Sequence, residues 1–165
     1  YVYKNGCYPI EGRIETAIFD ETNLGFRGKI IWFKGFFKEK NVWGTWRSAK
    51  SPTIRCYSES LLVFCKGRFL SGQNSDLTEQ EFLDYTKNVW TIPPIKPIDH
   101  PAAFPVELAK RAIKLFTFPG QTVLDPFMGS GTTAVACKEL GRNYVGFEIN
   151  PSYVELAKRR LASEI

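Results

Sequence analysis

The segment 122–133, TVLDPFMGSGTT, constrains the fold of this chain more than any other. It begins with an apolar run that predicts a buried parallel strand. Gly129 and Gly131 follow with one residue between them, and good helix formers then continue over 132–140 up to Gly141, a typical helix stop. A strand, a glycine turn and a helix in this order predict the first half of a nucleotide-binding βαβ unit. In such a unit the glycines let a ligand approach the backbone, and the helix N-terminus favours polar or anionic groups.

The second half of the unit follows at the expected distance. Residues 143–147 are a short apolar run that predicts a second strand, and Glu148 ends it. An acidic residue at this place, roughly 20 residues after the glycine turn, suits a ribose whose hydroxyls need an acceptor. Asn150 and Pro151 supply an N-cap and a first-turn proline for a helix over 152–161. The sequence therefore predicts a site for an adenosine ligand. The alternative is a packing turn of an α/β domain, with a merely solvated Glu148.

The glycine turn lacks the third glycine of the dinucleotide-binding pattern G-x-G-x-x-G. DPFMGSGTT at 125–133 resembles instead the first cofactor motif of S-adenosyl-L-methionine-dependent DNA amino-methyltransferases of the β class. HPAAFPVEL at 100–108 resembles the tenth motif of that family, which opens a helix beside the methionine end of the cofactor. The resemblance continues through 141–148 and 153–157. It implies an α/β fold with the Rossmann-like sheet of a class I methyltransferase, and S-adenosyl-L-methionine as the cofactor.

The resemblance also implies which residues bind the cofactor. Glu148 would accept the ribose hydroxyls, and the glycine turn would approach the ligand with its backbone. His100, the only histidine, would belong to the methionine side, unless it is a loop residue without ligand contact. Phe127 would pack on adenine, unless it belongs to the core. The implied cofactor-binding residues are His100, Pro101, Phe104, Pro105, Asp125, Phe127, Gly129, Ser130, Gly131, Thr132, Thr133 and Glu148.

Residues 34–55 interleave basic and aromatic side chains between two predicted strands, 29–33 and 60–65. Cations neutralise phosphates, and aromatic rings stack on exposed bases, which is worth about 1–3 kcal/mol per base. A long loop between two strands is more often functional than decorative. The sequence predicts a DNA contact here, and a solvated basic loop with structural tryptophans is the alternative. The predicted DNA-binding residues are Lys34, Lys38, Lys40, Trp43, Trp46, Arg47, Ser48, Lys50 and Arg55.

Part of this loop resembles the eighth motif of the family, with GTWRS at 44–48, then Pro52, and ESLLVF at 59–64. In the family this region helps to line the pocket for a flipped-out target base. Flipping is required because a stacked and paired amino nitrogen cannot reach a methyl donor. The GTWRS context favours cytosine over adenine as the target. The polar, loop-rich segment 67–99 lies where the resemblance implies a small target-recognition region.

The chain lacks the tetrapeptide of type (Ser/Asp/Asn)-Pro-Pro-(Tyr/Phe/Trp) with which the family positions the target amine. Pro93-Pro94 has isoleucine on both sides and lies just upstream of the tenth motif, so we assign it no catalysis. In the family order the tetrapeptide precedes all the motifs found here, and the sheet has strand order 3-2-1-4-5-7-6. The resemblance implies a helix over 8–23, the sixth strand at 29–33, the seventh at 60–65, the first at 122–124 and the second at 144–147.

The central strands four and five of that sheet are therefore absent from this sequence. Strands one and seven would each expose an unpaired inner edge. We expect a C-terminal part of a longer polypeptide, one half of a split enzyme completed by a second chain, or a domain that pairs with its own copy. The isolated chain should be poorly stable, bind the cofactor weakly or not at all, and methylate nothing. The expected segments are 1–33 (helix and sheet strand), 34–58 (DNA and base-pocket loop), 59–66 (strand), 67–99 (target recognition) and 100–165 (cofactor unit).

Composition fits an intracellular enzyme domain. The 165 residues carry a formal net charge of +5, which suits a polyanionic partner such as duplex DNA. The cysteines show no pairing rhythm and no Cys-x-x-Cys spacing, so neither disulfides nor a zinc site is predicted. No apolar run has membrane-spanning length and no signal peptide is visible, so we expect a cytoplasmic protein without a membrane partner. The resemblance implies that it is of prokaryotic type. The cysteines are Cys7, Cys56, Cys65 and Cys137.

These patterns together predict the cofactor- and DNA-binding part of a DNA methyltransferase, of restriction-modification or solitary type. It would methylate the exocyclic amine of cytosine, or of adenine, in duplex DNA by direct displacement, so Cys137 is not a candidate nucleophile. One alternative is a methyltransferase acting on RNA or a small molecule, although the basic aromatic loop favours nucleic acid. The other is a non-catalytic remnant that binds cofactor and nucleic acid.

Overall fold

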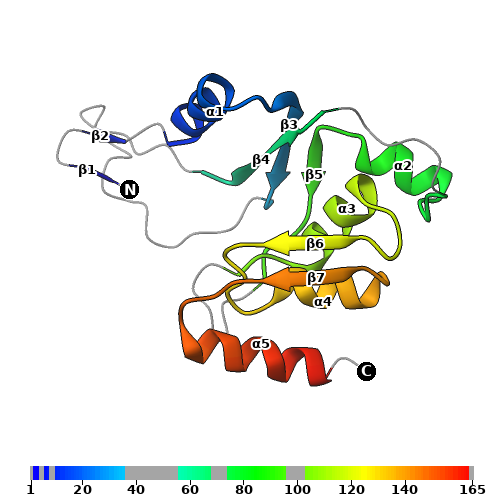
Figure 1. Cartoon of the computed structure of the whole chain (residues 1–165). Helices are drawn as coiled ribbons and strands as arrows, with labels where there is room; N and C mark the ends of the chain where they lie inside the picture. The colour runs from blue at the N-terminus through cyan, green and yellow to red at the C-terminus, as the bar shows by residue number, and fades with distance from the viewer. Residues whose placement is uncertain are drawn as a thin grey trace.

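The computed structural model of the chain describes residues 2–3, 6–7, 10–35, 56–67, 74–95 and 103–163. These residues form an α/β structure in which helices pack on two separate groups of strands (Figure 1). The elements are β1 (Val2–Tyr3), β2 (Gly6–Cys7), α1 (Ile10–Glu21), β3 (Gly25–Phe33), β4 (Ser58–Cys65), α2 (Glu79–Tyr85), β5 (Val89–Thr91), α3 (Val106–Phe116), β6 (Thr122–Asp125), α4 (Thr132–Glu139), β7 (Asn143–Gly146) and α5 (Pro151–Ser163).

The first group of strands has β3 at its centre. β4 pairs with β3 antiparallel, and β5 pairs with its other edge in parallel, so the order is β4-β3-β5. Buried and less buried positions alternate at the end of β3, where Ile30 and Trp32 turn toward the core. The small antiparallel pair β1–β2 stands apart from this sheet.

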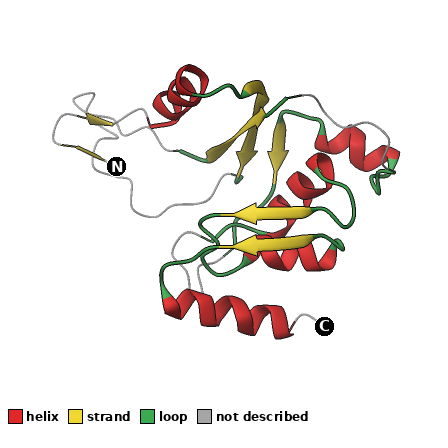
Figure 2. Cartoon of the chain, in the orientation of Figure 1, coloured by secondary structure: helices red, strands yellow, loops and turns green. Residues whose placement is uncertain are grey.

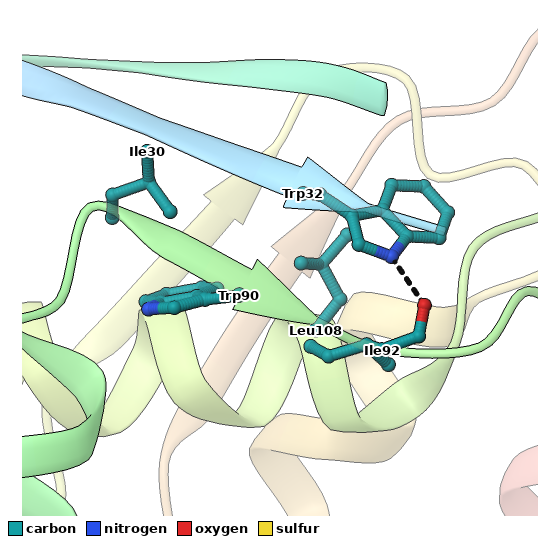
Figure 3. Packing of buried hydrophobic residues seen from close by; sticks show 5 residues of the cluster. All are labelled: Ile30, Trp32, Trp90, Ile92 and Leu108. Carbon is teal, nitrogen blue, oxygen red and sulfur yellow. Dashed lines mark hydrogen bonds between the residues drawn. The ribbon is translucent and has the colours of Figure 1, made fainter. Parts of the chain in front are cut away.

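A cluster of large side chains joins this sheet to α3 (Figure 3). Trp32 and Trp90 are register partners on β3 and β5, and both are buried. Leu108 of α3 completes the cluster with Ile30 and Ile92. The indole N–H of Trp32 donates a 2.7 Å hydrogen bond to the backbone oxygen of Ile92, so the polar group of the ring is satisfied inside the core.

The second group of strands is the predicted βαβ unit. β6 and β7 pair in parallel, with Leu124 opposite Val145, and α4 connects them. Buried Ala136 and Cys137 of α4 pack against buried residues of α3. The predicted strands and helices of the unit are confirmed, each boundary lying within two residues of the sequence-based expectation.

The segment 67–99 is more regular than its composition suggested. Helix α2 starts with a complete capping box, in which Thr78 accepts from the backbone N–H of Glu81 and the Glu81 side chain accepts from that of Thr78. β5 follows and adds a strand to β3. The expectation of a loop-rich segment was therefore wrong for 79–91, because the burial of Trp90 and the pairing with β3 stabilise a strand of only three residues.

β4 and β6 each have one edge that pairs with no other strand in the described part of the chain (Figure 2). A cavity of about 460 Å³ lies against these strands. Its lining includes Leu61 of β4, Ala112 and Phe116 of α3, and Val123 of β6. The gap between the two sheets is thus bordered by an apolar surface.

Candidate cofactor site

The turn that links β6 to α4 requires its two glycines. Gly129 has φ 52° and Gly131 has φ 80°, both in the left-handed region that other residues rarely adopt. A Cβ atom at Gly131 would stand 2.7 Å from the Cβ of Ala157, so α5 packs directly on the turn. The pattern G-x-G at this position is therefore explained by backbone conformation and by close packing.

Backbone hydrogen bonds hold the turn against the end of β7. The N–H of Met128 donates to the oxygen of Phe147 at 2.8 Å, and the N–H of Phe147 donates to that of Asp125 at 3.0 Å. The carboxylate of Asp125 accepts from the N–H of Phe127 at 3.0 Å. Asp125, which the sequence predicted as a cofactor residue, fixes the start of the turn in this structure.

Glu148 is joined directly to the glycine turn. One carboxylate oxygen accepts a 2.8 Å hydrogen bond from the N–H of Gly129, and the other accepts a 2.8 Å bond from the N–H of Asn150. The structure thus brings together the turn and the acid that the sequence predicted as partners. A carboxylate offers about four acceptor sites, so ribose hydroxyls can donate to the same two oxygens.

The N-terminus of α4 faces this turn. Gly131 is its N-cap, and no side chain caps the first turn of the helix. Helix N-termini carry backbone N–H groups without intrahelical partners, and they attract polar or anionic groups. Ser130 and Thr132 on either side of Gly131 are both buried.

Large apolar side chains that adjoin the turn and the acid in the sequence are exposed. Phe127 is 88% exposed, Phe147 61% and Ile149 98%. The alternative that Phe127 is a core residue is therefore wrong. Sequence reasoning did not select Phe147 and Ile149, although their position on both sides of Glu148 was a usable signal. Large exposed apolar side chains that occur together indicate a binding surface.

The other predicted cofactor residues divide into three groups. Phe104 packs against both clusters of buried side chains and lines the apolar cavity. Pro105 is the N-cap of α3, and Thr133 reaches the same cavity as Phe104. His100 and Pro101 lie outside the described residues.

Of the predicted DNA-binding residues, the structure describes only Lys34. It forms an ion pair with Glu59, and its ammonium lies 4.9 Å from the centre of the Trp32 ring. The remaining ones lie outside the described residues, namely Lys38, Lys40, Trp43, Trp46, Arg47, Ser48, Lys50 and Arg55.

The burial of Cys137 and the grouping of the potential metal ligands bear on the chemistry of the described residues. Burial raises the pKa of the Cys137 thiol to about 11, so it stays protonated near neutral pH. In this part of the chain no group of three or more His, Cys, Asp or Glu side chains could hold a metal ion. None of its helices is long and apolar enough to cross a membrane.

Comparison with known proteins shows the family of the chain. A family model described as DNA methylase, of the N6/N4 type, matches residues 16–159. The chain belongs to this DNA methylase family. Among its relatives, the type II methyltransferase M.BglI of Bacillus subtilis is 32% identical over 96% of the chain and 47% of the relative. M.MjaI of Methanocaldococcus jannaschii is 31% identical over 80% of the chain and 48% of the relative. The chain thus spans about half the length of these DNA methylases.

Solved structures show the same fold. A putative DNA modification methylase of Thermus thermophilus, TTHA0409, crystallised with S-adenosyl-L-methionine, is 29% identical and superposes with a TM-score of 0.75. The match covers 95% of this chain and 61% of that one. PvuII DNA methyltransferase, which is cytosine-N4-specific, is 22% identical with a TM-score of 0.71, over 91% of this chain and 56% of that one. The α/β fold of this chain is therefore that of the DNA methylases.

Proposed function

We propose that this chain is the cofactor- and DNA-binding part of an S-adenosyl-L-methionine-dependent DNA methyltransferase. The observation that carries this proposal is the bond from the Gly129 N–H to Glu148. It joins a glycine turn at a helix N-terminus to an acid at the end of the neighbouring parallel strand, an arrangement suited to a nucleoside. Membership of the DNA methylase family and the cofactor in the TTHA0409 crystals support the choice of nucleoside.

The residues around the turn fit this cofactor. The Glu148 carboxylate accepts the ribose hydroxyls, and the exposed surfaces of Phe127, Phe147 and Ile149 take the adenine ring. The N-terminus of α4 faces the polar methionine part. When bound, S-adenosyl-L-methionine supplies the sulfonium methyl group that passes to the exocyclic nitrogen of the target base. The chain contributes mainly orientation, which can supply about 7–11 kcal/mol when the geometry is good.

The site is completed by a segment outside residues 1–165, on the same polypeptide or on a second chain. This complement supplies two central strands and the tetrapeptide (Ser/Asp/Asn)-Pro-Pro-(Tyr/Phe/Trp). The unpaired edges of β4 and β6 and the apolar cavity beside them support this view, because unpaired edges and exposed apolar surface are costly. Helix α1 supports it too, since none of its residues is buried and Phe19 is among its exposed apolar side chains.

The target base, the DNA-binding residues and the cellular location are proposed from the sequence motifs. Cytosine is the preferred target base because of the GTWRS context at 44–48, with adenine as the second choice. The basic residues of 34–55 bind the backbone of duplex DNA, and 67–99 takes part in recognising its sequence. The enzyme acts in the cytoplasm of a prokaryotic cell, within a restriction-modification system or alone.

A methyl-transfer assay tests the proposal. The chain is incubated with duplex DNA and methyl-tritiated S-adenosyl-L-methionine, with and without the polypeptide encoded immediately upstream of Tyr1 in the same or an adjacent reading frame. We expect methyl incorporation only with the complement, and mass spectrometry of the released nucleosides should identify N4-methylcytosine. The control is a complement whose tetrapeptide starts with alanine, which should abolish transfer.

Three outcomes would contradict parts of the proposal. Micromolar cofactor binding and methylation by the chain alone would exclude the need for a complement. Methylation of RNA in preference to DNA would establish the RNA alternative. An upstream polypeptide without the tetrapeptide, together with no transfer, would leave the non-catalytic remnant as the correct description.

A further inference from the structure

Arg160 on α5 contacts the glycine turn with its guanidinium group. Its Nη1 donates to the backbone oxygen of Ser130 at 2.9 Å, to the Ser130 hydroxyl at 3.0 Å and to the Thr132 hydroxyl at 3.1 Å. These acceptors flank Gly131, the N-cap of α4. A single guanidinium group therefore holds both residues that border the N-cap.

The same face of α5 touches the turn a second time. Ala157, three positions before Arg160, packs against Gly131, where there is no room for a Cβ atom. Residues three apart lie on one face of a helix, so the two contacts act together. α5 supports the turn on one side of Gly131, while Glu148 holds Gly129.

The bonds from Arg160 to the two hydroxyls matter because serine and threonine side chains can themselves bind the free N–H groups of a helix N-terminus. Their side-chain oxygens readily accept from the backbone N–H groups of a first helical turn. Ser130 and Thr132 stand next to the N-cap of α4, yet no side chain caps this helix. Both hydroxyl oxygens accept from Arg160 instead. In this structure neither hydroxyl therefore accepts from the first N–H groups of α4.

The bond to the Ser130 backbone oxygen fixes the peptide plane that precedes Gly131. On the other side of this plane, the N–H of Gly131 donates to the oxygen of Met128 at 2.9 Å. The plane is thus held at both its oxygen and its nitrogen. This restrains a turn that two glycines with positive φ would otherwise leave flexible.

We propose that Arg160 is a positioning residue for the cofactor. It engages the hydroxyls of Ser130 and Thr132, the residues on either side of the N-cap, and keeps the glycine turn in the shape that receives the nucleoside. This inference rests on the proposed function and deepens it, since Arg160 acts through the turn and not on the cofactor itself. Losing a charge-assisted hydrogen bond should weaken cofactor binding about 10-fold to 100-fold.

The test compares three variants in the chain bound to its complement. Arg160→Met removes the donors with little loss of volume, Arg160→Lys keeps one charged donor, and Arg159→Met alters the exposed neighbour. For each, the Kd for S-adenosyl-L-methionine, the Kd for duplex DNA and the Tm are measured. We expect a roughly 10- to 100-fold higher cofactor Kd for Arg160→Met, partial recovery for Arg160→Lys, and values like the unaltered protein for Arg159→Met.

The DNA Kd and the Tm separate positioning from a structural role. If Arg160 positions the turn, the DNA Kd should stay within about twofold, since its contacts are confined to the turn and α4. A cofactor Kd for Arg160→Met equal to that of Arg159→Met would overturn the inference. A lower Tm of Arg160→Met, together with equal losses of affinity for S-adenosyl-L-methionine and for duplex DNA, would also overturn it. If the unaltered protein does not bind the cofactor at all, the proposed function itself fails.

Discussion

Replacing Asp76 by asparagine should lower the Tm of this chain by on the order of 10 °C. The Arg142 side chain is 0% exposed, and it donates to the two carboxylate oxygens of Asp76 at 2.5 and 2.7 Å. Asparagine removes the charge opposite a fully buried guanidinium. Breaking a buried ion pair costs about 3–5 kcal/mol, and we expect the lower end because Asp76 is itself 34% exposed.

The matched control is Asp84→Asn. Asp84 of α2 pairs with Lys87, two residues beyond the end of the helix, and both side chains are well exposed. Exposed pairs of this kind contribute little, so the Tm should scarcely change. If Asp76→Asn and Asp84→Asn have the same Tm, the Asp76–Arg142 ion pair does not stabilise the packing of 74–77 against the cofactor unit.

The pH dependence of this pair gives a second measurement. The hydrogen bonds from Arg142 hold the pKa of Asp76 below its ordinary value. A lowered folded-state pKa stabilises the fold fully above the unfolded pKa of about 3.9, and this contribution disappears as the pH falls through the folded pKa. The Tm difference between the unaltered chain and Asp76→Asn should therefore be constant from neutral pH to about pH 5 and shrink below about pH 4.

Gly131→Ala should destabilise the chain by about 2–5 kcal/mol and abolish cofactor binding. A non-glycine residue in the left-handed region costs about 1–2 kcal/mol, and φ is 80° here. The added Cβ would also stand 2.7 Å from the Cβ of Ala157, and such overpacking costs about 1–3 kcal/mol. Relief of this clash requires the turn to move relative to Glu148, which disrupts the site.

Gly120→Ala is the control for strain without a clash. Gly120 has the same φ of 80°, but nothing lies within 4 Å of the Cβ it would carry. Gly120→Ala should therefore lose only the stability that the backbone strain costs, and its cofactor binding should be unchanged. Adding Ala157→Gly to Gly131→Ala should recover part of the stability by making room for the new methyl group. If denaturant titration finds Gly120→Ala and Gly131→Ala equally destabilised, α5 does not pack on the turn as described.

The cofactor unit could be predicted from sequence because its signals are local. The apolar run before Asp125, the glycines and the cap at Asn150 each determine a neighbouring element. The meeting of Gly129 with Glu148 followed from topology, since the carboxyl ends of adjacent parallel strands lie at one edge of the sheet.

Features that depend on distant partners could not be predicted. The three residues of β5 become a strand by pairing with β3, which lies more than fifty residues earlier. Arg142 forms a buried ion pair with Asp76, which lies 66 positions away, and neither residue was selected from the sequence. Arg160 likewise bonds to Ser130, which lies 30 positions earlier in the chain. Such contacts depend on how the elements pack and leave no periodic pattern in the chain.

The central claim is that the glycine turn and Glu148 together hold the nucleoside. An NMR titration tests it directly, using the ¹⁵N-labelled chain bound to unlabelled complement, with S-adenosyl-L-methionine added in steps. We predict that the amide signals of Gly129, Gly131 and Asn150 shift most, and that Glu148→Ala removes these shifts. Shifts centred on other residues, such as those lining the cavity beside α3, or shifts that Glu148→Ala leaves unchanged, would contradict the claim.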